Sequence, residues 1–97
     1  MRRRVMRHDA NHKTIVDALR KCGAKVLDLS GIGSDCPDVL IAFRGRLILA
    51  EIKNPDNWYG KKGLTPGQRK FADGWADTPV MVILTVDDAL RAIGAIK

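Results

Sequence analysis

The sequence predicts a single α/β domain in which helices flank a mixed sheet, in the order helix, three strands, helix, strand, helix. Three observations lead to this prediction. The chain has 97 residues, 45% of them hydrophobic, which is enough for one thin core. Apolar residues recur at helical spacing in some segments and form short runs typical of buried strands in others. Glycine and proline lie between these segments, and the sequence contains no repeat or linker.

The first helix is predicted to begin at Asp9, a good N-cap residue, and to end at Gly23. A short strand is expected at 24–29, followed by a turn-rich loop at 30–35. The buried stripe of this helix is expected to be Ile15, Val16, Leu19 and Cys22.

Two apolar runs, 39–43 and 47–52, are separated only by Arg44-Gly45-Arg46. They predict a hairpin whose strands are buried on both faces and form the centre of the sheet. A two-residue turn at Arg44-Gly45 would place Asp38 opposite Glu51, and one at Gly45-Arg46 would place it opposite Lys53. A three-residue turn would put Asp38 opposite Ile52, on the other face.

The segment 54–64 predicts a long exposed loop. Thr65-Pro66-Gly67-Gln68 then has the pattern of a helix start, with Thr65 as the cap, Pro66 in the first turn and Gln68 completing a capping box. A buried strand at 79–84 and a helix at 87–96 complete the chain. The inward residues are expected to be Phe71, Ala72 and Trp75 in the earlier helix and Leu90 and Ile93 in the last.

The chain is basic, with 17 Lys and Arg against 11 Asp and Glu, a formal net charge of +6. A basic arm at 1–8 precedes the domain at 9–97. This excess favours a polyanionic partner such as a nucleic acid about as strongly as it favours a merely solvated face. The candidate nucleic-acid-binding residues are Arg2, Arg3, Arg4, Arg7, Lys61, Lys62, Arg69 and Lys70. For the adjacent Trp58 and Tyr59, base stacking and packing over the core stay equally open.

No apolar run approaches the roughly 20 residues of a membrane-spanning helix, and no apolar segment follows the basic start as a secretory signal would require. We therefore expect no membrane span and a cytoplasmic location. The two cysteines, Cys22 and Cys36, are expected to be reduced.

Glu51 and Lys53 are two residues apart in a predicted strand and so share one face. With Asp38 opposite, two carboxylates and an amine converge, and a divalent cation would offset the repulsion between the carboxylates. Hard oxygen ligands favour Mg²⁺ or Mn²⁺ and metal-assisted phosphodiester hydrolysis. Lys53 would position water, stabilise charge or act as a base. Taken alone, Glu-x-Lys is more often a strand-end salt bridge.

Two further polar residues, His12 and Gln68, lie on apolar helical stripes and are expected to point inward. For Gln68, capping and substrate contact have equal weight. For His12, a buried histidine with a satisfied hydrogen bond is favoured over metal ligation. His8 and His12 have the spacing of a zinc pair, but a third ligand is missing nearby, so zinc is discounted.

Pro37-Asp38 followed by Glu51-Ile52-Lys53, after one helix and before a Gln68-bearing helix, resembles the PD-(D/E)xK nuclease superfamily. Within it the chain is most similar to the small stand-alone VRR-NUC domains of phages and prophages. Three segments carry this closer similarity: Asp9-Ala10-Asn11-His12, Gly31-Ile32-Gly33 and Leu64-Thr65-Pro66-Gly67-Gln68.

This resemblance implies a restriction-endonuclease-like αβββαβ core and Mg²⁺- or Mn²⁺-dependent cleavage of DNA. Asp38, Glu51 and the main-chain carbonyl of Ile52 would hold the metal. Lys53 would be the catalytic lysine and Gln68 an accessory residue. His12 stands where relatives commonly carry a glutamate, which makes it a candidate further metal ligand.

Similarity to Holliday-junction resolvases implies a homodimer that acts on branched DNA, encoded by a phage or prophage and working in the host cytoplasm. The rival interpretations are a basic DNA-binding module that does not cut and an RNA-binding protein. Inward-facing Glu51 and Lys53 beside Asp38 argue against the first, because binding alone needs no buried carboxylates.

Overall fold

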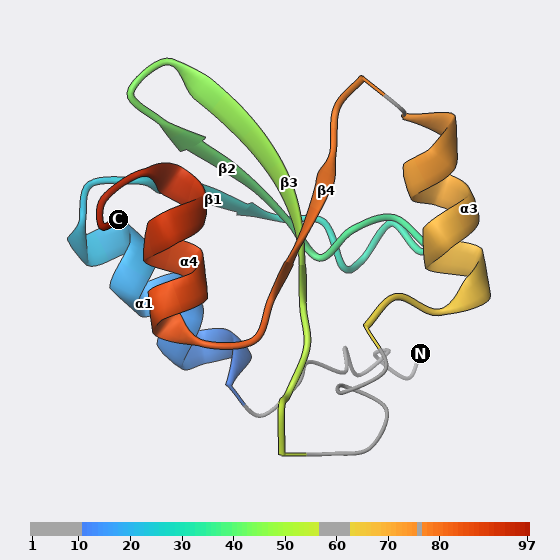
Figure 1. Cartoon of the computed structure of the whole chain (residues 1–97), viewed down its shortest axis with the longest axis horizontal. Helices are drawn as coiled ribbons and strands as arrows, with labels where there is room; N and C mark the ends of the chain where they lie inside the picture. The colour runs from blue at the N-terminus through green and yellow to red at the C-terminus, as the bar shows by residue number, and fades with distance from the viewer. Residues whose placement is uncertain (1–10, 57–62, 76) are drawn as a thin grey trace, which may run out of the picture.

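The computed structural model describes residues 11–56, 63–75 and 77–97, and Figure 1 shows the arrangement of its elements. In chain order these are α1 (His12–Lys21), β1 (Lys25–Asp28), β2 (Val39–Phe43), β3 (Arg46–Ile52), α3 (Pro66–Gly74), β4 (Val80–Ile83) and α4 (Val86–Ile93). The predicted order of helices and strands is confirmed. The expected N-cap of α1, Asp9, lies outside the described residues, and the helix follows Asn11.

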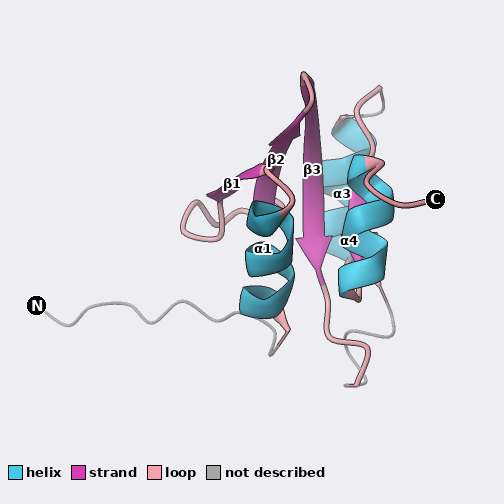
Figure 2. Ribbon diagram, turned by 90° about the vertical axis from the view of Figure 1, so that its left-hand side faces the viewer, coloured by secondary structure: helices cyan, strands magenta, loops and turns pink. Residues whose placement is uncertain are grey.

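The four strands form one mixed sheet in the order β1-β2-β3-β4. β2 pairs antiparallel with both β1 and β3, and β4 runs parallel to β3. The helices α1 and α4 lie side by side on one face of the sheet, and α3 lies on the opposite side (Figures 1 and 2). The molecule is therefore a small α/β domain with helices on both sides of a mixed sheet, as expected.

The turn between β2 and β3 has two residues, Arg44 and Gly45, with Phe43 paired to Arg46. Both central residues have positive φ, 50° at Arg44 and 80° at Gly45, as a type I′ turn requires. Of the three alternatives left open by the sequence, this is the one that places Asp38 opposite Glu51. The turn thus sets the register of every pair along the hairpin.

We expect Gly45→Ala to destabilise the protein by about 1–2 kcal/mol, because an L-residue in a left-handed conformation carries that cost. Gly74→Ala is the matched control. A Cβ would have no heavy atom within 4 Å at either glycine, but only Gly45 has positive φ. Urea denaturation of the two variants tests this, and equal stabilities would contradict the assigned turn.

The core lies between the sheet and the α1/α4 pair. Alternate residues of β2 (Val39, Ile41 and Phe43) are buried, and in β3 their counterparts are Ile48, Ala50 and Ile52. Ile83 of β4 and the predicted α1 residues Ile15, Val16 and Leu19 pack against them. Val26 and Leu90 are half-buried beside this cluster, and Ile93 is buried within it.

The opposite face of the sheet is less covered than predicted. No residue of α3 is buried, and Trp75, which ends this helix, is 50% exposed. The prediction of a buried stripe at Phe71, Ala72 and Trp75 is therefore wrong. A groove of about 550 Å³ lies between the helix and the sheet, lined by Leu29, Cys36, Leu40, Leu47, Leu49, Phe71, Trp75 and Thr78. The apolar residues here line an opening instead of filling a second core.

The expectation that the hairpin strands are buried on both faces holds for the consecutive buried residues 48–52 of β3, but β2 is fully buried only at alternate residues. Leu47 is 66% exposed and Leu27 is 58% exposed, while Met81 and Val82 of β4 are exposed because this is an edge strand. Cys22 is exposed because α1 ends one residue before it. We call the row of side chains that β1, β2 and β3 turn toward α3 the open face; it consists of Leu27, Leu40, Ala42, Leu47 and Leu49.

The outer edge of β1 is partly occupied from within the chain. Leu29 N–H donates to the carbonyl of Asp38, just before β2, so alternation along the strand turns the Val26 carbonyl outward. The Arg20 guanidinium on α1 donates to that carbonyl at 3.1 Å. The helix thus binds one of the polar groups that an edge strand otherwise leaves open.

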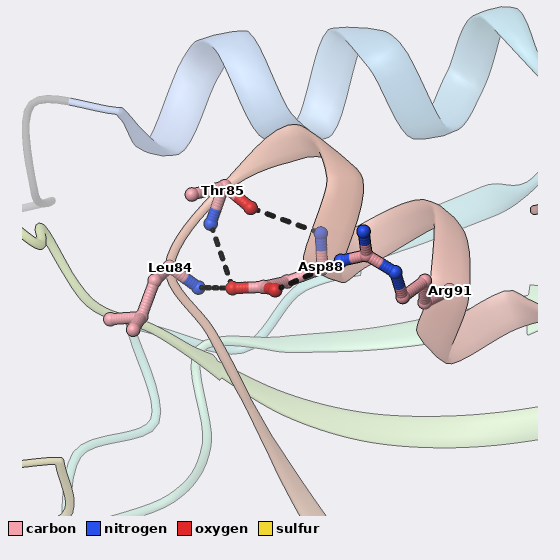
Figure 3. A network of polar contacts seen from close by, with 4 residues as sticks. All are labelled: Leu84, Thr85, Asp88 and Arg91. Carbon is pink, nitrogen blue, oxygen red and sulfur yellow. Dashed lines mark hydrogen bonds and ion pairs between the residues drawn. The ribbon is translucent and has the colours of Figure 1, made fainter. Parts of the chain in front are cut away.

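The last helix begins earlier than predicted because Thr85 caps it. The Thr85 hydroxyl accepts from Asp88 N–H at 3.0 Å, and the Asp88 carboxylate accepts from the N–H groups of Thr85 and Leu84 at 3.2 and 3.1 Å (Figure 3). Arg91 contacts the same carboxylate at 3.6 Å. The helix ends at Gly94, which has a left-handed φ of 82°.

Among the described residues, none of the helices has the length and apolar character needed to cross a bilayer.

Candidate functional site

Asp38, Glu51 and Lys53 share the face of the sheet that looks toward α3. The pairing of Val39 with Ala50 continues the hairpin register to Asp38 opposite Glu51. Because side chains alternate along a strand, these two lie on the face opposite the buried Val39 and Ala50, and Lys53 follows Glu51 on that face. The register of the two strands thus places these three residues next to one another on one face, as the sequence predicts.

The Asp38–Glu51 pair is one of the closely spaced pairs of the antiparallel hairpin. Leu29 N–H donates to the Asp38 carbonyl, so the peptide groups of Asp38 point toward β1 and not toward β3. Opposite residues that do not exchange backbone hydrogen bonds have their Cα atoms about 4.5 Å apart, with their side chains close together. The two carboxylates therefore leave the sheet from neighbouring positions.

A hydrogen bond fixes the Asp38 side chain at this end of the hairpin. The Ile52 N–H donates to Asp38 Oδ2 at 2.9 Å. This bond ties the carboxylate to the backbone of β3 beside Glu51. Such a bond restricts the rotation of the Asp38 carboxylate.

Glu51 is the only glutamate in the chain, and it is 4% exposed. A buried carboxylate is rare in proteins unless it is bonded or has a chemical role.

Cys36, in the loop before β2, responds to both carboxylates. Burial raises the pKa of the Cys36 thiol, and the negative charges of Glu51 and Asp38 raise it further. The two charges therefore act on one small region near the loop. A thiol held in its protonated form is a poor nucleophile.

We expect alkylation of Cys36 to require a higher pH than an ordinary thiol does, because the thiolate is the reactive form. The measurement is the rate of iodoacetamide labelling against pH in a Cys22→Ser background. Adding Glu51→Gln removes one of the charges that raise the pKa, so the midpoint should shift to lower pH. Adding Asp73→Asn on α3 should leave the midpoint unchanged, and identical midpoints in all three proteins would contradict the placement of Glu51.

The Ile52 main-chain carbonyl points toward β2, on the side where Asp38 lies. The Lys53 N–H donates to the Ile83 carbonyl of β4 at 2.9 Å, and peptide groups alternate between the two sides of a strand. The donation from Ile52 N–H to Asp38 gives the same direction independently. The three residues that supply the oxygen donors of the resemblance, Asp38, Glu51 and Ile52, therefore lie at the same end of the hairpin.

This donor set fits a hard divalent cation. Two carboxylates and one carbonyl supply only oxygen ligands, and Mg²⁺ or Mn²⁺ held by few protein groups keeps other positions for water and phosphate. No cluster of three or more His, Cys, Asp and Glu side chains capable of holding a metal occurs within residues 11–56, 63–75 and 77–97. A site on this hairpin would therefore rest on two side chains and the backbone.

Asn11 clamps the backbone next to the site. Its side-chain amide donates to the Lys53 carbonyl at 3.0 Å and to the Leu84 carbonyl at 2.7 Å. The start of α1 is thereby joined to the ends of β3 and β4.

Within the described part of the chain, Lys53 forms no ion pair with Asp38 or Glu51. The strand-end salt bridge, the simplest alternative for Glu-x-Lys, is thus not formed.

Gln68 completes the capping box predicted for α3. Thr65 Oγ1 accepts from Gln68 N–H at 3.2 Å, and Gln68 Oε1 accepts from Thr65 N–H at 2.9 Å. The capping role is confirmed, and the side-chain oxygen is used for it; substrate contact stays a prediction. Arg69 and Lys70 follow on the same helix and are exposed, as residues that contact a nucleic-acid backbone must be.

The loop before β2 approaches the first turn of α3 closely. A Cβ placed on Gly67 would lie 2.5 Å from Asp35 Oδ2, so only glycine fits beside this carboxylate without a shift. A negative charge near a helix N-terminus is favourable. The contact joins the loop that carries Cys36 to the helix that carries Arg69 and Lys70.

His12 is 8% exposed, which confirms that it points inward. It occupies the first position of α1 and lines a pocket of about 350 Å³ together with Asp28 and Val39. Val39 belongs to the buried face, so His12 approaches the sheet from the side opposite Asp38 and Glu51. The structure does not bring it together with these two carboxylates.

The remaining predicted residues lie outside the described part of the chain. They are Arg2, Arg3, Arg4, Arg7, Lys61 and Lys62, together with Trp58, Tyr59, His8 and Asp9.

Sequence reasoning missed the parts played by Asn11 and Pro37. Asn11 enters the sequence analysis only as part of the segment 9–12 that carries the family resemblance. A polar residue before an amphipathic helix is nevertheless a common sign of a cap or clamp. Pro37 belongs to the motif of the resemblance, whereas the structure shows that its side chain is also fully buried. In neither case does local sequence reveal which strand lies beside the residue.

No family model, curated protein or solved structure matches this chain.

Proposed function

We propose that this protein is a Mg²⁺- or Mn²⁺-dependent endonuclease that hydrolyses phosphodiester bonds in DNA. The observation that carries the proposal is the convergence of Asp38, Glu51 and the Ile52 carbonyl at one end of the β2–β3 hairpin, with Lys53 next along the same face. The proposal extends the α/β fold to the restriction-endonuclease-like core implied by the resemblance.

Each group has a part in this proposal. Asp38, Glu51 and the Ile52 carbonyl would hold the cation, which when bound supplies a Lewis acid that stabilises charge on a phosphate oxygen. Asp38 is kept in place by Ile52 N–H, so its position does not depend on substrate. Lys53 is free of ion pairs with both carboxylates within the described residues, which leaves its ammonium available to the reacting phosphate.

The Asn11 clamp supports the position of Lys53. With its carbonyl bonded to Asn11 and its N–H bonded to Ile83, the backbone of Lys53 is held on both sides after β3 ends. Only the side chain is then left to adjust. Holding reactive groups in a fixed geometry is a large part of catalysis, since it removes the entropy cost of alignment.

Affinity for DNA is assigned to basic residues outside the site. Arg69 and Lys70 are exposed on α3, on the side of the sheet toward which Asp38 and Glu51 face. Phosphate contacts from such residues position a duplex and carry no sequence information. We also propose that the protein selects branched DNA, including Holliday junctions.

A homodimer acting in the cytoplasm, in a phage-infected or prophage-carrying host, is also proposed. Two sites related by a two-fold axis can meet two strands of a junction. The open face supports self-association because Leu27 and Leu47 expose 58% and 66% of their surface there. Sedimentation equilibrium of the protein and of Leu47→Lys tests this; a wild-type monomer at micromolar concentration would overturn the dimer.

The test of function is cleavage of labelled four-way junction, flap, single-stranded and duplex DNA with Mg²⁺, Mn²⁺ or EDTA. Cutting that needs the metal and is fastest on the four-way junction is expected. Folded protein that binds these DNAs without cutting any of them would identify a DNA-binding module. Preference for structured RNA over all four DNAs would favour the RNA-binding alternative.

A further inference from the structure

We infer that Pro37 keeps the Ile52 carbonyl available to a cation by removing the one backbone N–H that would otherwise bond to it. The inference rests on the proposed cation site and assigns a positioning residue to it. Pro37 precedes Asp38 directly and is fully buried. Its effect would come from an atom that proline lacks.

The first step is the direction of the peptide groups in β2. Leu29 N–H donates to the Asp38 carbonyl, which turns the peptide groups of Asp38 toward β1. Since successive residues alternate, the groups of residues 37 and 39 point toward β3. Val39 faces Ala50 in this way, and the next such position along the hairpin brings residue 37 opposite Ile52.

The second step is what an ordinary residue would do at that position. Two residues in such a pair exchange both backbone hydrogen bonds, one in each direction. A residue with an N–H would therefore donate to the Ile52 carbonyl, and its own carbonyl would accept from Ile52 N–H. Proline has no N–H to donate, so the ladder cannot supply a donor for the Ile52 carbonyl.

The third step concerns the hydrogen bond that the Ile52 N–H makes. Ile52 N–H donates to Asp38 Oδ2 at 2.9 Å instead of continuing the ladder to residue 37. The pair Pro37-Asp38 thus changes both bonds that Ile52 would have made. One change orients a carboxylate, and the other leaves a carbonyl with its lone pairs beside that carboxylate. Both changes favour a cation at this end of the hairpin.

The wild-type protein tests the hydrogen bonding directly. Couplings measured by NMR across hydrogen bonds should link the Ala50 carbonyl carbon to Val39 N–H, and should link no amide to the Ile52 carbonyl carbon. A coupling to the Ile52 carbonyl would overturn the inference. Adding Mg²⁺ should then shift the carbonyl ¹³C resonance of Ile52 and leave that of Ala50 nearly unchanged; an unshifted Ile52 resonance in Mg²⁺-saturated protein would also overturn it.

Two substitutions restore the missing N–H. Pro37→Ala does so with a smaller side chain and Pro37→Val with a similar volume, so their comparison separates hydrogen bonding from packing. Both should weaken Mn²⁺ binding about tenfold by calorimetry, as loss of a group that supports a ligand typically does. Pro79→Ala, at an exposed proline before β4, is the control and should bind like wild type.

The outcomes separate this inference from the proposed function. If wild type binds no Mn²⁺, or if Glu51→Gln binds as tightly as wild type, the proposed cation site itself fails. If Glu51→Gln abolishes binding but both Pro37 variants bind like wild type, only the role of Pro37 fails. If Pro37→Ala weakens binding and Pro37→Val does not, packing explains the effect and the inference is overturned.

Discussion

Glu51→Gln should reduce metal-dependent DNA cleavage by roughly a thousandfold. The charge stabilisation that a bound cation provides is worth several kcal/mol, and each 1.36 kcal/mol corresponds to a factor of about ten in rate. Glutamine keeps the size of the side chain but removes the negative charge that would hold the cation in the proposed site. The measurement is single-turnover cleavage of a four-way junction in Mg²⁺.

Two comparisons make this prediction specific. Asp38→Asn should give a loss of similar size, whereas Asp73→Asn, an exposed carboxylate on α3, should cleave like wild type. Junction affinity measured in EDTA should be retained by all three variants, because phosphate-binding lysines and arginines supply it. Wild-type cleavage by Glu51→Gln would show that the catalytic site lies elsewhere.

Leu19→Ala should lower the free energy of unfolding by about 3 kcal/mol. Leu19 has 0% exposure in the last turn of α1 and belongs to the core cluster, and truncating a buried leucine removes packing and leaves a cavity. Against a total stability of about 5–15 kcal/mol, this is a large fraction. Urea denaturation measures it.

Leu27→Ala is the matched control, because it makes the same chemical change at a residue that is 58% exposed. We expect it to cost less than about 0.5 kcal/mol in the monomer. Equal losses in the two variants would mean that the open face is covered in solution. The contrast therefore reports which side of the sheet forms the closed core.

The sequence predicted the fold well where short-range patterns decide it. The run at 39–43, the Thr65 cap with Gln68, and the stripe of Ile15, Val16 and Leu19 all occur as expected. Each is governed by residues only a few positions apart, so the local pattern carries the information. The hairpin register also depends on a single turn. The turn at Arg44-Gly45 is one of the three turns that the sequence allows.

The failures concern how elements meet in space. Trp75 and Leu47 are large hydrophobic residues of the kind found in protein cores. Both are nevertheless largely exposed, and both line the groove beneath α3. Hydrophobicity shows which residues favour burial, but not how closely a neighbouring helix approaches. His12 was placed on the correct side of its helix, but which face of the sheet that helix covers is a tertiary property.

In the candidate site too, some features follow from local sequence patterns and others only from the tertiary structure. The register that places Asp38, Glu51 and Lys53 on one face could be predicted because strand periodicity and one turn relate these residues; their catalytic role stays a prediction. The contributions of Asn11 and Pro37 depend on partners far away or on a missing backbone atom. A motif can thus name the reactive groups, while the groups that hold them emerge only from the folded chain.

Arg20 has a consequence for how copies of this protein can meet. By occupying the Val26 carbonyl with a guanidinium, it obstructs strand addition at β1, and a foreign strand would first have to displace this charged group. Growth of the sheet from molecule to molecule, the route to fibrils, is discouraged there. The exposed leucines of the open face can then serve association between copies without strand addition at the β1 edge.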